Sequence, residues 1–412
     1  MKTSNKPCRI ASVIASEIRT IFTSYSILLV LAGGIFVYGL LYNYMYEPNL
    51  IRHAPVAVVD RSMSSLSREY IRLFDAAPQV EVRTGGVGFP EAKKMMDRGE
   101  AAGIVYIPSD FAERVNRGEE AVFVLYGTTE AFLYYEALQE AAAGAMLELD
   151  GRYRPQQVVF LPQQVVVPVT QTPAVTISGT ALFNPTGGYG SYLIPAVLMV
   201  IIFQTLLMVV GMIGGGERDT GAIRRFAACG LSWGGMARVV AGKTFVYCML
   251  YALFSIFLLG LLPVVFSLPD IGCKYRIVML MIPYLMATSF FGLAATVFFT
   301  DSESPVLMIA FFSVGLIFLS GVSYPLELMP WYWKAAHFVF PAAPGTLAFV
   351  KLNSMGATMA DIRTEYLTLW GQCAVYFVLA CMAYRRNTAR ALRAKGLPEH
   401  RPSSEGRGEE NR

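Results

Sequence analysis

The sequence is poor in charge, since only 16% of its 412 residues are Asp, Glu, Lys or Arg, while 54% are apolar. A soluble protein carries about 25% charged residues. The deficit has a physical cause, because an Arg, Lys or Asp at the centre of a bilayer costs roughly 2.5–3.5 kcal/mol. The composition therefore indicates a membrane protein. The net charge of +4, without a basic patch interleaved with aromatic residues, gives no indication of nucleic-acid binding.

Cysteine and histidine are scarce as well. The six cysteines form no CxxC pair, none of them lies between Glu47 and Pro185, and the three histidines are far apart along the chain. We therefore expect neither a disulfide framework nor a metal site. We interpret the cysteines as small apolar residues of membrane spans and tails.

Long apolar runs without charge dominate the rest of the chain. A run of about 20 such residues crosses a hydrocarbon layer of ~30 Å. The first run is longer than the apolar core of a signal peptide and no A-x-A cleavage site follows it, so we interpret it as an uncleaved anchor. The predicted spans are Tyr25–Met45, Tyr189–Gly216, Thr244–Phe266, Ile277–Thr300, Pro305–Tyr324 and Tyr366–Tyr384.

The distribution of Lys and Arg predicts the orientation of these spans. Basic residues gather in the N-terminal tail, between the second and third spans, and in the tail 385–412, which an even number of spans places on one side. Basic short loops mark the cytoplasmic side, so we predict a multi-pass protein of the bacterial inner membrane with both termini in the cytoplasm. The turn 301–303 falls on that side without Lys or Arg. The end of the tail is predicted to be disordered.

The region 1–46 holds the first span and a short stretch before it. Apolar residues recur at helical spacing from Ile10 to Thr20, with Glu17 and Arg19 among the polar residues between them. This pattern indicates either an amphipathic helix in the cytoplasmic interface or an extension of the first span.

Strand and helix patterns alternate in residues 47–186. The β-branched run Val56–Val59 precedes a helical stretch at Ser64–Asp75, for example, and such alternation predicts an α/β layer. The predicted fold is thus a membrane all-α protein with six transmembrane helices and an inserted α/β extracytoplasmic domain. No catalytic constellation or Gly-rich phosphate loop stands out there, which favours a docking or structural role over a substrate site.

The connection after the second span carries the first distinctive motif. It begins Glu217-Arg218-Asp219-Thr220-Gly221 and closes with Gly242-Lys243. This order resembles the cytoplasmic signature of ABC-2 type exporter permeases, whose coupling helix sits in a groove of a separate ATPase subunit. The family's usual Pro before the Ser turn is replaced by Gly230 and Leu231. The resemblance assigns ATPase coupling to the segment 217–243, and within it to Glu217, Arg218, Thr220, Gly221, Arg224, Arg225 and Ser232.

A second motif follows the fifth predicted span. Gly321 and Pro325 break a helix, and such breaks are tolerated at membrane depth only where protein or a cavity surrounds them. The motif resembles the outer signature of the same family, in which short re-entrant helices precede the last span, here in residues 321–365. An ordinary end of a span is the other interpretation. The residues assigned to this exit and re-entrant region are Ser320, Gly321, Pro325, Pro330 and Pro341.

The resemblance also implies partners. The chain, with its remaining spans in 187–384, is expected to pair with a second copy or a paralogous permease, with ABC ATPase subunits, with membrane lipids and with a periplasmic adaptor. ATP and Mg are expected on the ATPase and no cofactor on this chain. Gly242-Lys243-Thr244 looks like the end of a phosphate-binding loop, but Ala237 stands where that motif needs a Gly. We therefore expect neither ATP binding nor enzymatic activity in this chain.

The predicted span cores contain no charge, which argues against an ion-coupled carrier and for transport powered from outside the chain. We expect a largely apolar cavity and, as cargo, an amphipathic or lipid-like molecule or a drug that is moved out of the cytoplasm or the inner leaflet. Two alternatives stay open: a surface receptor or assembly protein that uses the same scaffold without transport, and an intramembrane enzyme, for which the spans offer no catalytic residue types. The candidate cavity-lining residues are Gln204, Thr205, Thr288, Ser289 and Ser313.

Overall fold

The computed structural model describes residues 10–46, 51–85, 87–117, 121–127, 132–153, 189–268 and 270–394. The chain forms two compact units. Unit 1 comprises Met1–Glu47 and Gly190–Arg412, and unit 2 comprises Pro48–Tyr189.

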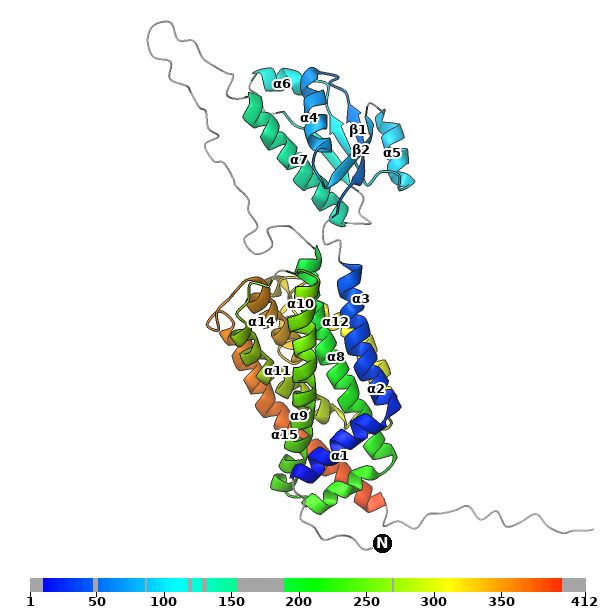
Figure 1. Cartoon of the computed structure of the whole chain (residues 1–412), viewed down its shortest axis with the longest axis vertical. Coiled ribbons are helices and arrows are strands. Elements are labelled where there is room, and N and C mark those ends of the chain that lie inside the picture. The colour runs from blue at the N-terminus through cyan, green and yellow to red at the C-terminus, as the bar shows by residue number, and fades with distance from the viewer. Residues whose placement is uncertain are drawn as a thin grey trace, which may run out of the picture. The chain divides into compact units, whose positions relative to one another are not determined.

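Every regular element described in unit 1 is a helix (Figure 1). In chain order these are α1 (Ile10–Thr23), α2 (Tyr25–Ala32), η1 (Gly33–Val37), α3 (Tyr38–Met45), α8 (Tyr189–Asp219), η3 (Ala222–Cys229), α9 (Trp233–Ser255), η4 (Ile256–Leu261), α10 (Leu262–Val265), α11 (Lys274–Ala295), α12 (Ser304–Leu319), η5 (Leu326–Leu328), α13 (Trp331–His337), α14 (Ala342–Ser354) and α15 (Arg363–Ala394).

Five helical stretches of the described residues are long and apolar enough to cross a membrane, and a bent pair of helices is a candidate for a sixth. The pair joins α13 to α14 with a bend of 82°. The chain is thus a mostly helical, multi-pass membrane protein, as the sequence predicts. The five stretches are Tyr25–Met45, Tyr189–Asp219, Trp233–Val265, Lys274–Ala295 and Arg363–Arg393.

The predicted fifth span, Pro305–Tyr324, is shorter than the sequence indicates. The helix α12 has 16 residues, which corresponds to about 24 Å at 1.5 Å per residue. It ends at Leu319 because Gly321 adopts a φ of +86°, in the left-handed region where a helix cannot continue.

Other span boundaries also differ from the prediction, and the fourth span, predicted at Ile277–Thr300, is the helix Lys274–Ala295. The third span begins at Trp233 rather than Thr244, and the hydroxyl of Ser232 caps it by accepting a hydrogen bond from Gly235 N at 3.2 Å. The last helix runs on to Ala394, so the first part of the predicted tail 385–412 is helical. No Gly or Pro interrupts that stretch, and Arg, Ala and Leu are good helix formers. The remainder of the tail lies outside the described residues.

The helix α1 is a separate helix, not an extension of the first span. The chain leaves helical conformation at Ser24, with φ −95° and ψ 112°, before α2 begins. Val13, Glu17 and Ile21, four residues apart, are the buried residues of α1, so one face packs against α9. Glu17, assigned to the polar side from sequence, therefore belongs to the buried face.

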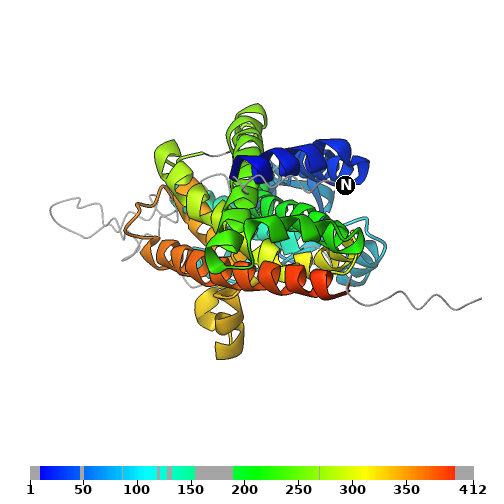
Figure 2. The same cartoon turned by 90° about the horizontal axis from the view of Figure 1, so that it is seen from below.

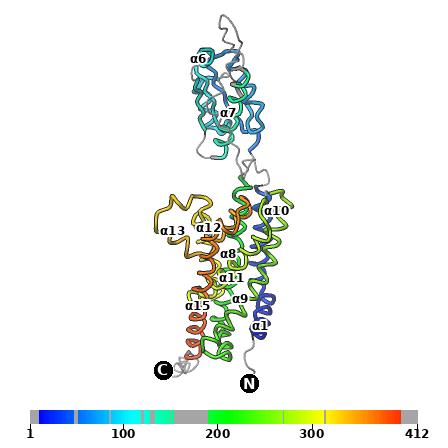
Figure 3. The backbone as a smooth tube through the Cα atoms, turned by 90° about the vertical axis from the view of Figure 1, so that its left-hand side faces the viewer, coloured from blue at the N-terminus to red at the C-terminus, as the bar shows by residue number. Residues whose placement is uncertain are grey.

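The helix α8 is the centre of unit 1. Small residues let its neighbours approach closely: a Cβ at Gly34 would lie 2.4 Å from Thr205 Cγ2, and a Cβ at Gly292 would lie 3.0 Å from Val210. Seen from below, α1 and α15 lie on opposite sides of this centre (Figure 2). In the side view, α13 projects from the bundle, and its Trp331 is 80% exposed (Figure 3).

Unit 2 contains a small sheet with helices on both faces. The strand order is β2-β1-β3-β4, in which β1 pairs in parallel with β2 and β3, and β4 is antiparallel to β3. Alternate residues of β1 face opposite ways: Val56 and Val58 pack with α4 and α7, while Ala57 and Val59 pack with α5. The elements are β1 (Ala54–Asp60), α4 (Ser65–Asp75), β2 (Val80–Gly85), α5 (Phe89–Asp97), β3 (Gly103–Ile107), α6 (Phe111–Arg117), β4 (Val124–Gly127) and α7 (Phe132–Tyr153).

Candidate coupling site

One end of unit 1, here named the basal end, gathers α1, η3 and the last turns of α15 (Figures 1 and 3). The chain reaches it along α8, which stops at Asp219, and Gly221 then turns the backbone with a φ of +66°. In the following 3₁₀ helix η3, Ile223, Phe226 and Cys229 are buried. Since a 3₁₀ helix has three residues per turn, these residues share one face, which holds η3 against the bundle.

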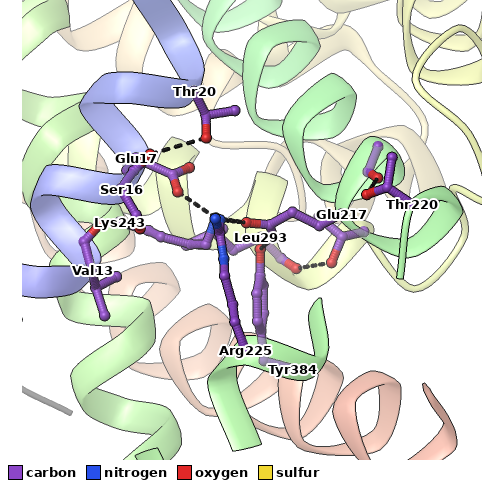
Figure 4. Close-up of polar contacts among 12 residues, drawn as sticks. Val13, Ser16, Glu17, Thr20, Glu217, Thr220, Arg225, Lys243, Leu293 and Tyr384 are labelled. Atoms are coloured by element: carbon purple, nitrogen blue, oxygen red, sulfur yellow. Dashed lines mark hydrogen bonds and ion pairs between the residues drawn. The ribbon is translucent and has the colours of Figure 1, made fainter. Parts of the chain in front are cut away.

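Four charged residues meet where η3 packs against the bundle, and we name them the charge cluster: Glu17, Glu217, Lys243 and, on η3 itself, Arg225 (Figure 4). Lys243 Nζ lies 2.7 Å from Glu17 Oε2 and 2.9 Å from Glu217 Oε1. The second cation, Arg225, places Nη2 2.5 Å from the same Glu217 Oε1. The side chains of Glu17 and Lys243 are fully buried, that of Glu217 is 4% exposed, and that of Arg225 is 37% exposed.

Aromatic residues complete the surroundings of the cluster. The hydroxyl of Tyr247 donates to Glu17, and that of Tyr384 donates to Glu217 Oε2 at 3.5 Å. Lys243 Nζ also lies 5.3 Å from the centroid of the Phe226 ring, within the range of a cation–π contact. Each buried carboxylate therefore has a cationic partner and a hydroxyl donor.

Two carboxylates and two cations give the charge cluster a formal charge of zero. Buried ions are expensive unless they are paired, and removing one partner of a buried pair costs about 3–5 kcal/mol. The residues of the cluster and its hydroxyl donors come from α1, α8, η3, α9 and α15. The cluster thus ties the segment after α8 to the next helix, α9, and to α1 and α15, which are distant in sequence.

Arg218 reaches the opposite way from its neighbour Glu217. Its Nη1 donates to the carbonyls of Thr296, Val297 and Phe299 at 2.9, 2.8 and 2.6 Å. These are carbonyls at and just after the C-terminus of α11, which have no partner within the helix. Adjacent residues at the end of α8 therefore hold the two sides of the basal end together.

The three glycines Gly214–Gly216 explain how α8 comes so close to the turn 301–303. A Cβ at Gly215 would lie 1.8 Å from the carbonyl oxygen of Asp301, and a Cβ at Gly214 would lie 2.3 Å from Thr296 Cγ2. Only glycine fits at such distances. The sequence marks the same residues only as the end of an apolar run.

Asp301 gives the turn 301–303 a structural role. Its Oδ1 accepts hydrogen bonds from the backbone N–H of Glu303 and Ser304 at 2.9 and 2.8 Å, at the start of α12. The hydroxyl of Ser304, together with these N–H groups, lowers the pKa of Asp301 to about 2. The acidic turn, an exception to the charge bias in the sequence, thus supplies a side-chain acceptor for two backbone N–H groups at the start of α12, whose N-cap residue is Glu303.

The predicted coupling residues fall into two groups. Glu217 and Arg225 join the charge cluster, and Arg218 caps α11. Thr220, Arg224 and Ser232 are exposed, with the hydroxyl of Thr220 donating to Gly216 O at 2.6 Å. Contact of any of them with an ATPase stays a prediction.

Glu17, Tyr247 and Tyr384 escaped the sequence analysis as members of this site, and Lys243 entered it only as the end of the segment 217–243. The helices run past the predicted uncharged cores, so that Glu217 and Lys243, each adjacent to a core, lie inside the helical stretches Tyr189–Asp219 and Trp233–Val265. A signal for Glu17 was present, since it stands midway between Val13 and Ile21 on an apolar stripe. Its partner could not be read from the sequence, because Glu17 and Lys243 are 226 residues apart.

The other end of unit 1, the distal end, contains the first turn of α8, α13 and α14. Pro325, Pro330 and Pro341 stand immediately before η5, α13 and α14, so each proline begins a short helix. Ser320 is buried at the end of α12, and its hydroxyl donates to Ile317 O at 2.6 Å. The two helices and their bend agree with a broken or re-entrant segment in 321–365, and the role of these residues in substrate exit stays a prediction.

The predicted cavity-lining residues are packed within unit 1. Thr205, Thr288 and Ser289 are buried, and Gln204 is half-buried. Thr205 Oγ1 donates to Ile201 O at 2.7 Å, and Ser289 Oγ lies 3.9 Å from Cys248 Sγ. The side chain of Ser313 lies outside the described residues. Lining of a cavity stays a prediction for all five.

The apolar helices define a polytopic membrane protein, and the charge cluster connects several of these helices at the basal end. The chain matches the family model described as ABC-2 family transporter protein over residues 19–382, and it belongs to that family. Searches of curated proteins and of solved structures give no match. Members of this family are the membrane components of ABC transporters, which work with an ABC ATPase subunit and are not themselves catalytic.

Proposed function

We propose that the chain is the permease subunit of an ATP-driven exporter that acts as a dimer with a second copy or a paralogous permease. Its cargo is an amphipathic or lipid-like molecule or a drug, taken from the cytoplasm or the inner leaflet. The observation that carries the proposal is the pairing of an exposed short helix, η3, with the charge cluster that includes its Arg225.

The exposed side of the basal end is suited to receive an ATPase subunit. Arg224, Leu231 and Trp233 are exposed there, and the guanidinium of Arg385 lies 5.9 Å from the ring centroid of Trp233. ATP and Mg would be bound by the partner. A displacement of η3 would be transmitted to α1 and α9 by Lys243, and to α11 by Arg218, so that one surface contact moves several spans together.

The other parts of the chain have roles that follow from this one. The basic tails and connection favour a cytoplasmic basal end in an inner membrane with both termini inside. Substrate would leave near Ser320 and Pro330 at the distal end. Unit 2 follows the first span and precedes the second, so it would be extracytoplasmic, where its α/β fold could guide substrate or dock a periplasmic adaptor.

Co-expression with a candidate ATPase tests the proposal. We expect the tagged chain to retain the ATPase through purification, and the complex in nanodiscs to hydrolyse ATP and move a fluorescent lipid or drug. The variant Leu231→Asp on the exposed side of the basal end should lose the ATPase, whereas Leu328→Asp at the distal end, also exposed, should retain it. A chain that retains no ATPase would instead support the alternative of a membrane-anchored receptor or assembly protein.

A further inference from the structure

The charge cluster is asymmetric in its access to solvent. Lys243 and Arg225 both bind Glu217 Oε1, at 2.9 and 2.5 Å, but Lys243 is fully buried while Arg225 is 37% exposed and stands on η3. Because its side chain is fully buried, Lys243 is held between Glu17 and Glu217. Arg225 is the member of the cluster that another molecule can reach.

Departure of Arg225 would change the charge of the site. With both cations present the four side chains sum to zero, and without Arg225 the buried residues Glu17, Glu217 and Lys243 sum to −1. A buried net charge is unfavourable for two reasons. Burial removes the hydration of the ions, and the low local dielectric strengthens the repulsion between the two carboxylates. The two carboxylates would then share a single ammonium group.

Loss of Arg225 from the cluster would affect the contact of Glu17 with Lys243. The carboxylate of Glu17 connects α1 to α9 through Lys243 and Tyr247. The same two helices also approach closely at Val13 and Gly242, where a Cβ on the glycine would lie 3.2 Å from Val13 Cγ1. Weakening the hold of Lys243 on Glu17 therefore loosens α1.

The surroundings of Arg225 favour an acidic partner. Exposed basic residues dominate the same end of unit 1 on η3 and on the last turns of α15. A surface that docks there is expected to carry carboxylates, and a carboxylate near Arg225 would compete with Glu217 for its guanidinium. These exposed residues are Arg224, Arg385, Arg386, Arg390 and Arg393.

We propose that Arg225 is an exchangeable cation: a carboxylate of the docked ATPase draws it from Glu217, the remaining cluster becomes negative, and α1 loosens from α9. Arg225 is thus a positioning residue that acts through Glu217, Lys243 and Glu17. The identity of the docking partner rests on the proposed function, whereas the effect of the charge on α1 does not.

The effect of charge is tested on the chain alone in nanodiscs, by hydrogen–deuterium exchange of the α1 amides. We expect Arg225→Gln to speed this exchange about tenfold, because local opening follows local stability. The matched control Arg224→Gln removes the same charge from the same helix, next to but outside the cluster, and should leave α1 unchanged. Equal exchange in the two variants overturns the proposal.

A double variant separates charge from a general loss of structure. In Glu217→Gln with Arg225→Gln, the buried charges are Glu17 and Lys243, which sum to zero and keep the ion pair between α1 and α9. We expect the α1 amides of this double variant to exchange within about threefold of wild type, although Arg225→Gln alone exchanges faster. A double variant whose α1 exchanges as fast as that of Arg225→Gln alone overturns the charge argument.

Addition of the ATPase tests whether Arg225 leaves Glu217 for a carboxylate of the partner. In the wild-type complex we expect α1 to exchange faster than in the chain alone, and in the double variant we expect no such change. If the ATPase binds and the hydrogen exchange of wild-type α1 is unaffected, the proposal that Arg225 changes its partner is wrong. If no ATPase binds, the proposed function fails, while the results on the chain alone still decide whether charge controls α1.

Discussion

The two ends of unit 1 are held together by different chemistry. At the basal end, side chains of opposite charge pair with one another across α1, α8, η3 and α9, as in the 2.7 Å contact of Lys243 with Glu17. At the distal end, several side chains bind backbone carbonyls: Gln372 Nε2 donates to Phe338 O at 2.8 Å, and the hydroxyls of Tyr192 and Tyr376 donate to Val322 O and Val339 O. The contrast is one of degree, since Arg218 also binds carbonyls at the basal end and Lys351 pairs with Glu365 at 2.6 Å at the distal end.

The difference has a consequence for how each end responds to change. A backbone carbonyl is present whatever residue occupies its position, so loss of a side chain at the distal end removes one hydrogen bond, worth about 1 kcal/mol. A buried ion has no water molecule or other group to replace a partner that is lost. Loss of one charge at the basal end leaves the others unpaired, which costs about 3–5 kcal/mol. Loss of a charge at the basal end is therefore expected to cost more stability than loss of a hydrogen bond at the distal end.

The largest effect is expected for Lys243→Met. The substitution keeps much of the side-chain volume and leaves the carboxylates of Glu17 and Glu217 with the single cation Arg225. We expect a loss of about 3–5 kcal/mol in the free energy of unfolding, measured by chemical or thermal unfolding in detergent. The matched control is Lys274→Met, which removes a cation that is 58% exposed and paired with Asp270, and it should cost at most about 1 kcal/mol. Equal losses in the two variants would contradict the comparison of the ends.

The charge cluster also marks the limit of what the sequence could predict. The five confirmed spans follow from apolar runs, a local property, and the breaks at Gly321 and Pro325 follow from the backbone preferences of two residue types. The bounds at Trp233 and Ala394 depend on a serine cap and on uninterrupted helix formers. A serine cap and a run of helix formers are weaker indications of a helix boundary in the sequence than a change in hydropathy.

Burial of Glu17 and Lys243 could not be predicted, because a charge beside an apolar run is usually taken as its end. Here the apolar helices continue past both residues, and a partner far away in the sequence makes burial tolerable. The same holds for Arg218, whose three acceptors are backbone carbonyls of α11 and the turn after it. The family resemblance points to the right segment but does not reveal which of its residues face inward.

The second largest effect is expected for Gly215→Ala. A Cβ would lie 1.8 Å from the carbonyl oxygen of Asp301, so α8 and the turn 301–303 must move apart. We expect a loss of about 1–3 kcal/mol, as for other overpacked sites, seen as a lower unfolding temperature. In Gly371→Ala the new methyl group meets nothing within 4 Å, and its greater helix propensity should stabilise α15 by up to about 1 kcal/mol. A stabilising effect at both positions would rule out the close approach.

A smaller effect is expected at the distal end for Tyr376→Phe. The substitution removes only the hydroxyl that donates to Val339 O, between α13 and α14. We expect a loss of about 1 kcal/mol or less in the same unfolding measurement. Tyr275→Phe, at a tyrosine that is 70% exposed, is the control and should be close to neutral. A loss as large as that of Lys243→Met would show that the distal end is not held by replaceable hydrogen bonds.

The smallest effect is expected for Asp301→Asn, because asparagine keeps the same shape and retains a side-chain oxygen that accepts from the backbone N–H groups of Glu303 and Ser304. Since the pKa of Asp301 is about 2, below its ordinary value of 3.8, the ionised carboxylate stabilises the fold above about pH 4. That contribution is lost as the pH falls through about 2. The difference in unfolding temperature between wild type and Asp301→Asn should therefore be constant from pH 8 to 5 and shrink below about pH 4. Glu303→Gln, an exposed acid of the same turn, is the control, and a difference that instead changes between pH 8 and 5 would refute the hydrogen bonds of Asp301 as the origin of the low pKa.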